Sequence, residues 1–305
     1  MSSQPDRLFA LASIACAIVT PTAALGQSDA PLIFAAASKW HVSYDKDGCR
    51  LARAFGSADA PVSTIFSRYS PGDGFQLAIS GAPFKRFMNV NKAYLQFGPT
   101  EAKQDHEYMA GELGKGVPAL IFRGLRLAPA TPEEKKRLER AAWNEPFEPL
   151  PLTPERKAAV TYLEVSRSTG KVIRLATGPM KAPLAALDKC IEDLMTTWGI
   201  DVARHARLSR KVMPAASPAT WVTNSDYPAD QQMRGEQGIV NFRLSVDEKG
   251  AVSACHIQQS TRPAKFDEIV CRALTRRAKF HPALDAQGNA LASYYPGRFI
   301  FAIQP

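Results

Sequence analysis

Residues 238–260, GIVNFRLSVDEKGAVSACHIQQS, place the tightest limit on what this chain folds into. Apolar and polar residues alternate from 240 to 247, which is the period of a strand with one face buried and the other in water. Asp-Glu-Lys-Gly at 247–250 then predicts a tight turn, because Gly250 reaches positive φ at little cost. Alternation is less regular from 252 to 259, so we expect a bulge in this second strand or burial of both its faces. The segment is therefore predicted to be an antiparallel hairpin.

A helix and a third strand are predicted after the hairpin. Residues 265–278 bring acidic side chains to the first turn of a helix and apolar side chains to one stripe of it. That stripe comprises Phe266, Ile269, Val270, Ala273 and Leu274. The segment SYYPGRFIFAIQ at 293–304 alternates again, and Pro296 lacks an amide hydrogen, which places this strand at the edge of a sheet. We expect three antiparallel strands with one helix packed on them.

Three arginines of this helix, Arg272, Arg276 and Arg277, lie outside the apolar stripe, the last two near its C-terminal end. The simpler interpretation is a solvated face that the helix dipole stabilises. The alternative is a docking surface for acidic partners.

The first 26 residues have the layout of a secretory signal peptide. Arg7 supplies a short positive region, residues 8–19 are uncharged and mostly apolar, and Ala24-Leu25-Gly26 places small residues before a cleavage site at Gln27. The apolar run is shorter than the roughly 20 residues that span a bilayer. We therefore predict export to the periplasm, with a mature chain that starts at or near Gln27. The alternative is an uncleaved segment that anchors the chain in the inner membrane.

The use of cysteine agrees with export. Beyond Cys16, which belongs to the predicted signal peptide, four cysteines remain, and an even number in an exported chain indicates disulfides. Cys255 lies on the second hairpin strand and Cys271 on the helix expected to cover it, with 15 residues between them. Cys49 and Cys190 are then left to each other. We predict these two bonds, one in each domain; the alternative is four free, buried thiols.

Residues 27–205 are predicted to form a separate, strand-rich mixed α/β domain of unknown role. Short alternating segments between Pro, Gly and Asp turns fill 39–126. The segment TPEEKKRLERAAW at 131–143 begins with a Thr cap, a proline and two glutamates, which is typical of a helix start.

Two further elements complete this domain. A hairpin is expected at 158–178, and residues 182–200 form a helical face that carries Cys190. A connector rich in Arg, Ala, Ser and Pro at 206–222 then leads to the C-terminal domain at 223–305. The predicted fold class of the whole chain is α+β.

The C-terminal domain carries an ordered series of motifs. They are Tyr227-Pro228, the Gly235-x-x-Gly238 spacing, the Gly250 turn, Ser260-Thr261, Phe266-Asp267, Phe280-x-Pro282-Ala283 and Gly288. This series resembles the C-terminal domain of TonB-family energy transducers. The resemblance covers about 80 of the 305 residues and implies a three-stranded antiparallel sheet with one packed helix. The uncleaved N-terminal helix and the long Pro-rich spacer of TonB itself have no visible counterpart in this sequence.

The resemblance also implies a function, the binding of an extended segment of an outer-membrane TonB-dependent transporter as an added β-strand. We expect the contact on the edge strand, around Arg298, Phe299 and Ile300. The partner is then such a transporter or another protein of the cell envelope. The alternative is an envelope protein in which the fold has a structural or oligomerising role, for example as a homodimer, without energy transduction.

No pattern in the sequence predicts an enzyme, a cofactor or a metal site. The segment Ser168-Thr169-Gly170-Lys171 fits the Ser-x-x-Lys pattern of acyl-transfer enzymes, but it lies in a predicted hairpin turn and has no companion motif. The five histidines lack the spacing of metal ligands. The net charge of +9 favours anionic surfaces or acidic partners, whereas the lack of a basic stripe interleaved with aromatic residues argues against nucleic acid.

Overall fold

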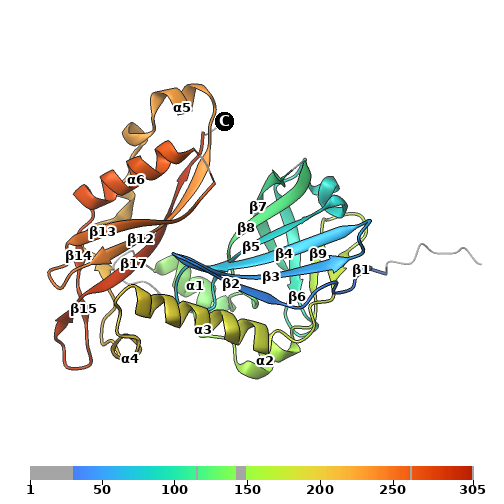
Figure 1. Cartoon of the computed structure of the whole chain (residues 1–305), viewed down its shortest axis with the longest axis horizontal. Helices are drawn as coiled ribbons and strands as arrows, with labels where there is room; N and C mark the ends of the chain where they lie inside the picture. Colours follow the sequence, from blue (N-terminus) through green and yellow to red (C-terminus); the bar gives the residue numbers. More distant parts are fainter. Residues whose placement is uncertain (1–29, 115, 142–148, 262, 304–305) are drawn as a thin grey trace, which may run out of the picture.

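The computed structural model (Figure 1) describes residues 30–114, 116–141, 149–261 and 263–303. The predicted signal peptide lies outside these residues. Buried apolar side chains form two hydrophobic cores, one between Phe34 and Met195 and the other between Val212 and Phe301. We call the part of the chain around the first core the N-terminal region and the part around the second core the C-terminal domain.

Ten strands of the N-terminal region form one sheet. Their order is β1-β10-β9-β6-β7-β8-β5-β4-β3-β2, and neighbours are antiparallel except for β1 and β10. The strands span Leu32–Phe34 (β1), His41–Asp45 (β2), Gly48–Gly56 (β3), Pro61–Arg68 (β4), Phe75–Gly81 (β5), Lys92–Phe97 (β6), Gln104–Leu113 (β7), Val117–Leu125 (β8), Leu163–Ser166 (β9) and Ile173–Leu175 (β10).

The two ends of this sheet meet. The amide of Ala37 donates to the carbonyl of Ala54 (2.9 Å), and the amide of Gly56 donates to the carbonyl of Ala35 (2.8 Å). The segment after β1 therefore pairs with β3, and the sheet closes into a barrel-like layer. Aromatic side chains that are almost fully buried fill much of its core: Phe55, Phe66, Phe84, Phe87, Phe97 and Phe122. Phe84 and Phe87 come from a 3-10 turn, η1 (Ala82–Phe87).

The described helices of the N-terminal region are α1 (Pro132–Arg140), α2 (Pro154–Ala159), α3 (Lys181–Thr197) and α4 (Val202–His205). The predicted start of α1 is confirmed. The amide of Glu134 donates to Thr131 Oγ1 (3.1 Å), and the amide of Thr131 donates to Glu134 Oε2 (2.8 Å), which is a capping box. The predicted continuation of this helix to residue 143 falls partly outside the described residues.

Helix α3 covers β2 and β3 with the apolar face that the sequence predicts. Its buried side chains are Leu184, Leu187, Cys190, Ile191, Leu194 and Met195. A disulfide joins Cys190 of α3 to Cys49 of β3, with 6.1 Å between the Cα atoms. This bond holds the helix against the sheet.

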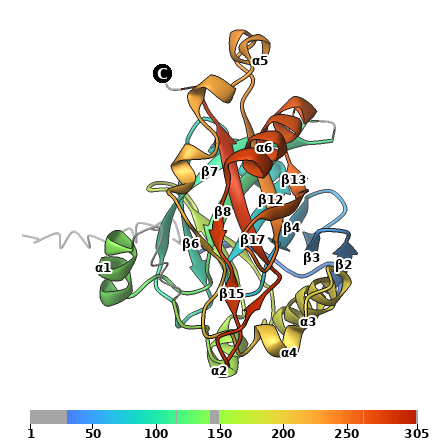
Figure 2. The same cartoon turned by 90° about the vertical axis from the view of Figure 1, so that its left-hand side faces the viewer.

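The C-terminal domain has a three-stranded antiparallel sheet in the order β13-β12-β17. Its strands are β12 (Gly238–Val246), β13 (Val252–Ser260) and β17 (Ser293–Phe301), and helix α6 (Ala264–Arg277) packs on one face (Figure 2). The disulfide Cys255–Cys271 ties α6 to β13, with 5.5 Å between the Cα atoms. The two disulfides are the same two pairs that the sequence predicts. The predicted sheet, helix and fold class agree with the structure.

Smaller elements surround this sheet. They are β11 (Met213–Pro214), which pairs with β14 (Phe280–His281), β15 (Ala283–Leu284), which pairs with β16 (Ala290–Leu291), the short helix α5 (Ala229–Met233), and the 3-10 turns η2 (Pro218–Thr220) and η3 (Asn224–Asp226).

The hairpin turn and the irregular second strand have the features expected from the sequence. Gly250 has φ of +79°, and a Cβ atom there would lie 1.9 Å from the carbonyl oxygen of Phe280. In β13, Ser253 and Gln258 have no partner in the register with β12, so the strand bulges twice. Only glycine fits the turn, and the bulges explain why the alternation of this strand is irregular.

The motif residues at the start of the C-terminal domain pack around α6. The Tyr227 ring stands edge-on to Phe266 (5.6 Å) and to Phe301 (5.2 Å), which stack on each other at 3.9 Å between ring centroids. Arg277 donates to both carboxylate oxygens of Asp226 (2.5 and 3.0 Å) and to the carbonyl of Trp221 (2.9 Å). Arg277 is thus a structural link, whereas Arg272 and Arg276 are exposed as the simpler interpretation expects.

One expectation for β12 is wrong. The alternation predicts that its polar face is in water, but Asn241 and Arg243 are only 9% and 4% exposed. The N-terminal region covers this face: Gln258 Nε2 donates to the carbonyl oxygens of Asp47 (2.7 Å) and Tyr69 (2.9 Å). Arg243 and Gln258 are tolerated there because they find hydrogen-bond partners on the other side of the interface.

The segment expected to be a connector, residues 206–222, is built into the C-terminal domain. Val212, Trp221 and Val222 belong to its hydrophobic core. The Arg210 guanidinium donates to the carbonyl of Pro282 from Nε (3.3 Å) and Nη2 (3.0 Å). No free tether therefore separates the two parts of the chain over these residues.

Candidate functional site

The outer side of β17 is the first candidate surface. Over its nine residues, from Ser293 to Phe301, β17 pairs only with β12 among the described strands. This confirms that the strand containing Pro296 lies at a sheet edge. An edge strand offers unpaired backbone groups to another chain.

The hydrogen bonds of β12 show which backbone groups of β17 point outward. Ile239 donates to Thr261 Oγ1 (2.9 Å), and its carbonyl accepts from the amide of Thr261 (3.0 Å), so both groups of Ile239 point towards β13. Ile239 is the register partner of Ile300, which makes this a non-hydrogen-bonded pair. The amide and carbonyl of Ile300 therefore face away from β12, and the same alternation applies to Arg298, whereas Pro296 offers only its carbonyl.

The three residues expected at the contact do not share one face of the sheet. Phe299 is opposite Val240 in the register and packs on the core side, with its ring centroid 4.9 Å from that of Phe301. Arg298 and Ile300 lie on the face towards the N-terminal region, and Ile300 remains 42% exposed. The structure thus places two of the three residues where their side chains and outward backbone groups are both accessible from the same surface.

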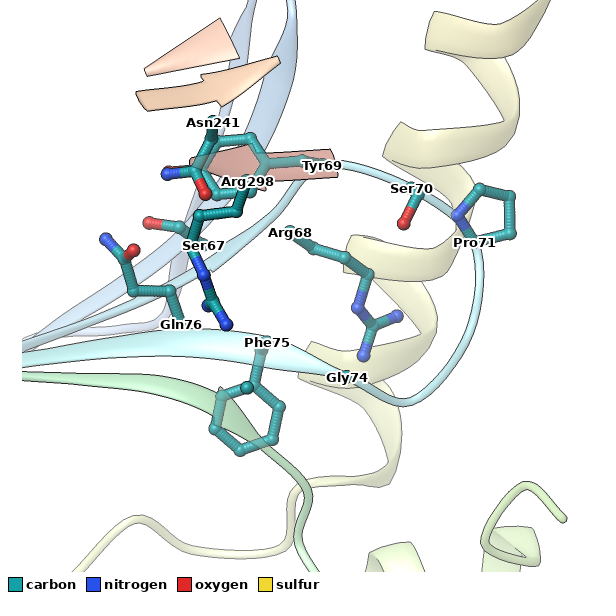
Figure 3. A pocket seen from close by; sticks show the side chains of 11 residues that line it. Ser67, Arg68, Tyr69, Ser70, Pro71, Gly74, Phe75, Gln76, Asn241 and Arg298 are labelled. Atoms are coloured by element: carbon teal, nitrogen blue, oxygen red, sulfur yellow. The ribbon is translucent and has the colours of Figure 1, made fainter. Parts of the chain in front are cut away.

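A pocket of about 200 Å³ opens beside Arg298, between the N-terminal region and the C-terminal sheet. In Figure 3 the Arg298 side chain descends from β17 towards Phe75, between Gln76 and Arg68. The other lining residues come from the end of β4, the β4–β5 turn, β8 and β12: Ser67, Tyr69, Ser70, Pro71, Gly74, Gly124 and Asn241. Sequence reasoning missed these residues, because they come together only when the two parts of the chain pack.

Of the two arginines that line the pocket, Arg68 has an acidic partner, whereas Arg298 lies near another cation. Arg68 forms an ion pair with Asp188 of α3. Partial burial lowers the pKa of Arg298, and the positive charge of Arg123 lowers it further. Burial also raises the pKa of Tyr69 to about 12. At neutral pH the pocket therefore presents cations and a protonated phenol.

A second group of contacts holds the two parts of the chain together beside the pocket. The Arg243 guanidinium lies 4.1 Å from the ring centroid of Trp198 and 3.5 Å from Asp47, and burial lowers its pKa. Tyr294 of β17 stacks on His205, with 5.6 Å between ring centroids, and meets Trp198 edge-on. Burial lowers the pKa of His205. These groups are packed into an interface, and we assign them a structural role.

Other chemistry has little support in the described residues. They contain no group of histidine, cysteine and acidic side chains arranged to hold a metal ion. His256 lies beside Ser245, 3.5 Å from its hydroxyl, and burial lowers its pKa. Ser168, Thr169 and Gly170 lie in a bend before β10, as expected for turn residues.

A three-stranded antiparallel sheet with one helix on one face and an open edge strand defines a small α+β domain. Residues 223–303 match the family model described as Gram-negative bacterial TonB protein C-terminal, and this part of the chain is a TonB-family C-terminal domain. The family is associated with the Gram-negative cell envelope and with transport, and its domains bind partners rather than catalyse reactions. Comparison of the whole chain with curated proteins found no match. Within the described residues, no helix is both long and apolar enough to cross a bilayer.

Proposed function

We propose that this protein is exported to the periplasm and binds an extended segment of an outer-membrane TonB-dependent transporter by β-strand addition to β17. The observation that carries the proposal is the nine-residue edge strand whose Arg298 and Ile300 backbone groups point away from the sheet. An added strand gains main-chain hydrogen bonds from these groups, and alternate side chains supply selectivity. The domain family supports this class of partner.

The N-terminal region sets this protein apart from a free TonB-type domain. It packs on the face of the sheet opposite α6, through Asp47, Tyr69 and Trp198. A bound strand at β17 therefore lies close to both parts of the chain. We propose that the N-terminal region restricts which segments are accepted.

The test uses the whole exported chain and a proline at Ile300. Ile300→Pro removes an outward amide without removing a bond to β12, so the fold should persist while strand addition is weakened. Ile300→Val is the matched control, because it keeps the amide and a β-branched side chain. Each protein is immobilised and exposed to a detergent extract of Gram-negative outer membranes, and retained proteins are identified by mass spectrometry.

We expect the wild type and Ile300→Val to retain TonB-dependent transporters and Ile300→Pro to lose them. Equal retention by Ile300→Pro, with its circular dichroism unchanged, would show that no segment docks on this edge. Recovery of only the protein itself favours the alternative, an envelope protein that assembles through the exposed edge around Ile300. Size-exclusion chromatography with light scattering then measures the homodimer directly.

Export is tested separately. A mature N-terminus at or near Gln27 in the periplasmic fraction supports the predicted signal peptide. Intact Met1 or Ser2 in the inner-membrane fraction would establish the anchored alternative.

A further inference from the structure

The pocket beside Arg298 brings together positive charges with few carboxylates. Several arginines elsewhere in the chain, and Arg68 in the pocket wall, have a carboxylate partner, as in Arg68–Asp188, Arg174–Glu164 and Arg204–Asp285. Within the described residues, no ion pair joins Arg298 or Arg123 to a carboxylate, and the positive charge of Arg123 is close enough to lower the pKa of Arg298. Two like charges held together without a counter-charge cost free energy, and a bound anion removes that cost.

The buried, unpartnered polar groups near the pocket are mainly hydrogen-bond donors. Arg68 and Tyr69 line the pocket, and Arg123 directly precedes the lining residue Gly124. Arg68 Nε, Tyr69 Oη and Arg123 Nη1 are buried and have no hydrogen-bond partner in the described structure. Two of these groups are donors only, and the phenol is protonated at neutral pH because its pKa is raised to about 12. The Arg68 side chain is only 3% exposed, so its unused donor cannot turn into bulk water.

A water molecule explains this arrangement poorly. Water satisfies donors, but it carries no charge and leaves the repulsion between Arg298 and Arg123 in place. A ligand with several acceptor oxygens and a negative charge meets both needs. Charge-assisted bonds from arginine to carboxylate or phosphate are the strong ones in proteins.

From this geometry we propose that the pocket binds an oxyanion, the carboxylate or phosphate group of a small ligand, between Arg298 of β17 and the ends of β4 and β8. Its volume of about 200 Å³ is below the usual range for drug-sized ligands, so it accepts one small anionic group rather than a nucleotide. Because its walls come from both parts of the chain, the bound anion also stabilises their association.

The pocket is partly open and its lining residue Arg298 is exposed, so a ligand can enter without the two parts of the chain separating. Asn241 and Gln76 also line the pocket and have amide groups that accept or donate hydrogen bonds (Figure 3). This site uses side chains on the inner face of β17, and the strand addition proposed above uses its outward backbone groups. The two proposals therefore stand or fall separately.

The test measures thermal unfolding of the whole exported chain with sodium phosphate, sodium succinate or sodium chloride at equal ionic strength. Variants Arg298→Gln and Arg123→Gln remove one charge each, and Arg276→Gln on the exposed face of α6 is the matched control. At a 100-fold excess of anion over Kd we expect the wild type and Arg276→Gln to gain about 5 °C in Tm over sodium chloride. Arg298→Gln and Arg123→Gln should bind about tenfold more weakly in isothermal titration.

A larger effect of phosphate than of succinate identifies a phosphate ligand, and the reverse identifies a carboxylate. Equal Tm gains in all four proteins would mean a general salt effect and would overturn the proposal, as would no gain beyond sodium chloride in the wild type. Arg298→Gln keeps its backbone amide, so retention of transporters by this variant separates the pocket from the strand-binding edge.

Discussion

The two disulfides close loops of very different length, and this difference predicts how much each stabilises the protein. Cys49 and Cys190 are 141 residues apart, whereas Cys255 and Cys271 are 16 apart. On the chain-entropy model, the long loop corresponds to about 5 kcal/mol and the short loop to about 3 kcal/mol. Cys49 and Cys190 are also fully buried, so replacing both by alanine removes more packed volume than at the partly exposed Cys255. The pair Cys49→Ala/Cys190→Ala should therefore lower the free energy of unfolding by about 2 kcal/mol more than Cys255→Ala/Cys271→Ala.

Urea unfolding of the oxidised wild type and the two double variants measures this difference. Tryptophan fluorescence reports on both parts of the chain, because Trp40 and Trp198 contact the first core and Trp221 lies in the second. Far-UV circular dichroism must give the same transition for a single free energy to be defined. An equal or larger loss in the Cys255→Ala/Cys271→Ala variant would refute the loop-length argument. Such a result would show instead that the C-terminal domain needs the Cys255–Cys271 disulfide to keep its packing.

Three further predictions concern single residues. Arg243→Met leaves Asp47 without its cation, so we expect a loss of about 3 kcal/mol in unfolding free energy and a shift in the fluorescence of Trp198; an unchanged spectrum would contradict the stacking. Gly250→Ala puts a Cβ atom against the Phe280 carbonyl at positive φ and should cost about 1–3 kcal/mol in urea unfolding, whereas Gly72→Ala, with positive φ but nothing within 4 Å, should cost less. Arg277 holds the pKa of Asp226 well below its usual value of 3.8 through a hydrogen bond, so this pair stabilises the fold above that value and the contribution is lost as pH falls below it. The free energy of unfolding of Arg277→Gln should therefore fall less steeply than that of the wild type as the pH is lowered below 3.8. Identical acid unfolding curves for the two proteins would show that Arg277 does not stabilise the ionised form of Asp226.

Local patterns in the sequence predict the elements of the C-terminal domain well. The alternation in β12, the apolar stripe of α6 and the proline of β17 depend on neighbouring residues, which share the period of a strand or a helix. The same holds for the Thr131 cap and the Gly250 turn. The cysteine pairs are also accessible from the sequence, because few combinations exist and one pair lies on adjacent elements.

The candidate site itself depends on contacts that no local pattern encodes. Periodicity shows that Arg243 and Arg298 face away from the core of their own domain, but not what covers that face. Arg123 and Arg298 approach each other from strands 175 residues apart along the chain. The closure of the N-terminal sheet through Ala37 and Ala54 is likewise not predicted by any periodic pattern in the sequence.

The sequence by itself thus determined which segments form strands and helices, and it identified the C-terminal domain and its edge strand. Only the tertiary structure decided that β12 is buried on both faces, that Val212, Trp221 and Val222 belong to the C-terminal core, and that a pocket lined by Arg68 and Arg298 forms between the two parts. The physical reason is that side-chain periodicity records one buried face per element. The packing of one folded surface on another is set by the complementarity of polar groups, such as Gln258 with Asp47 and Tyr69, that are distant in the chain.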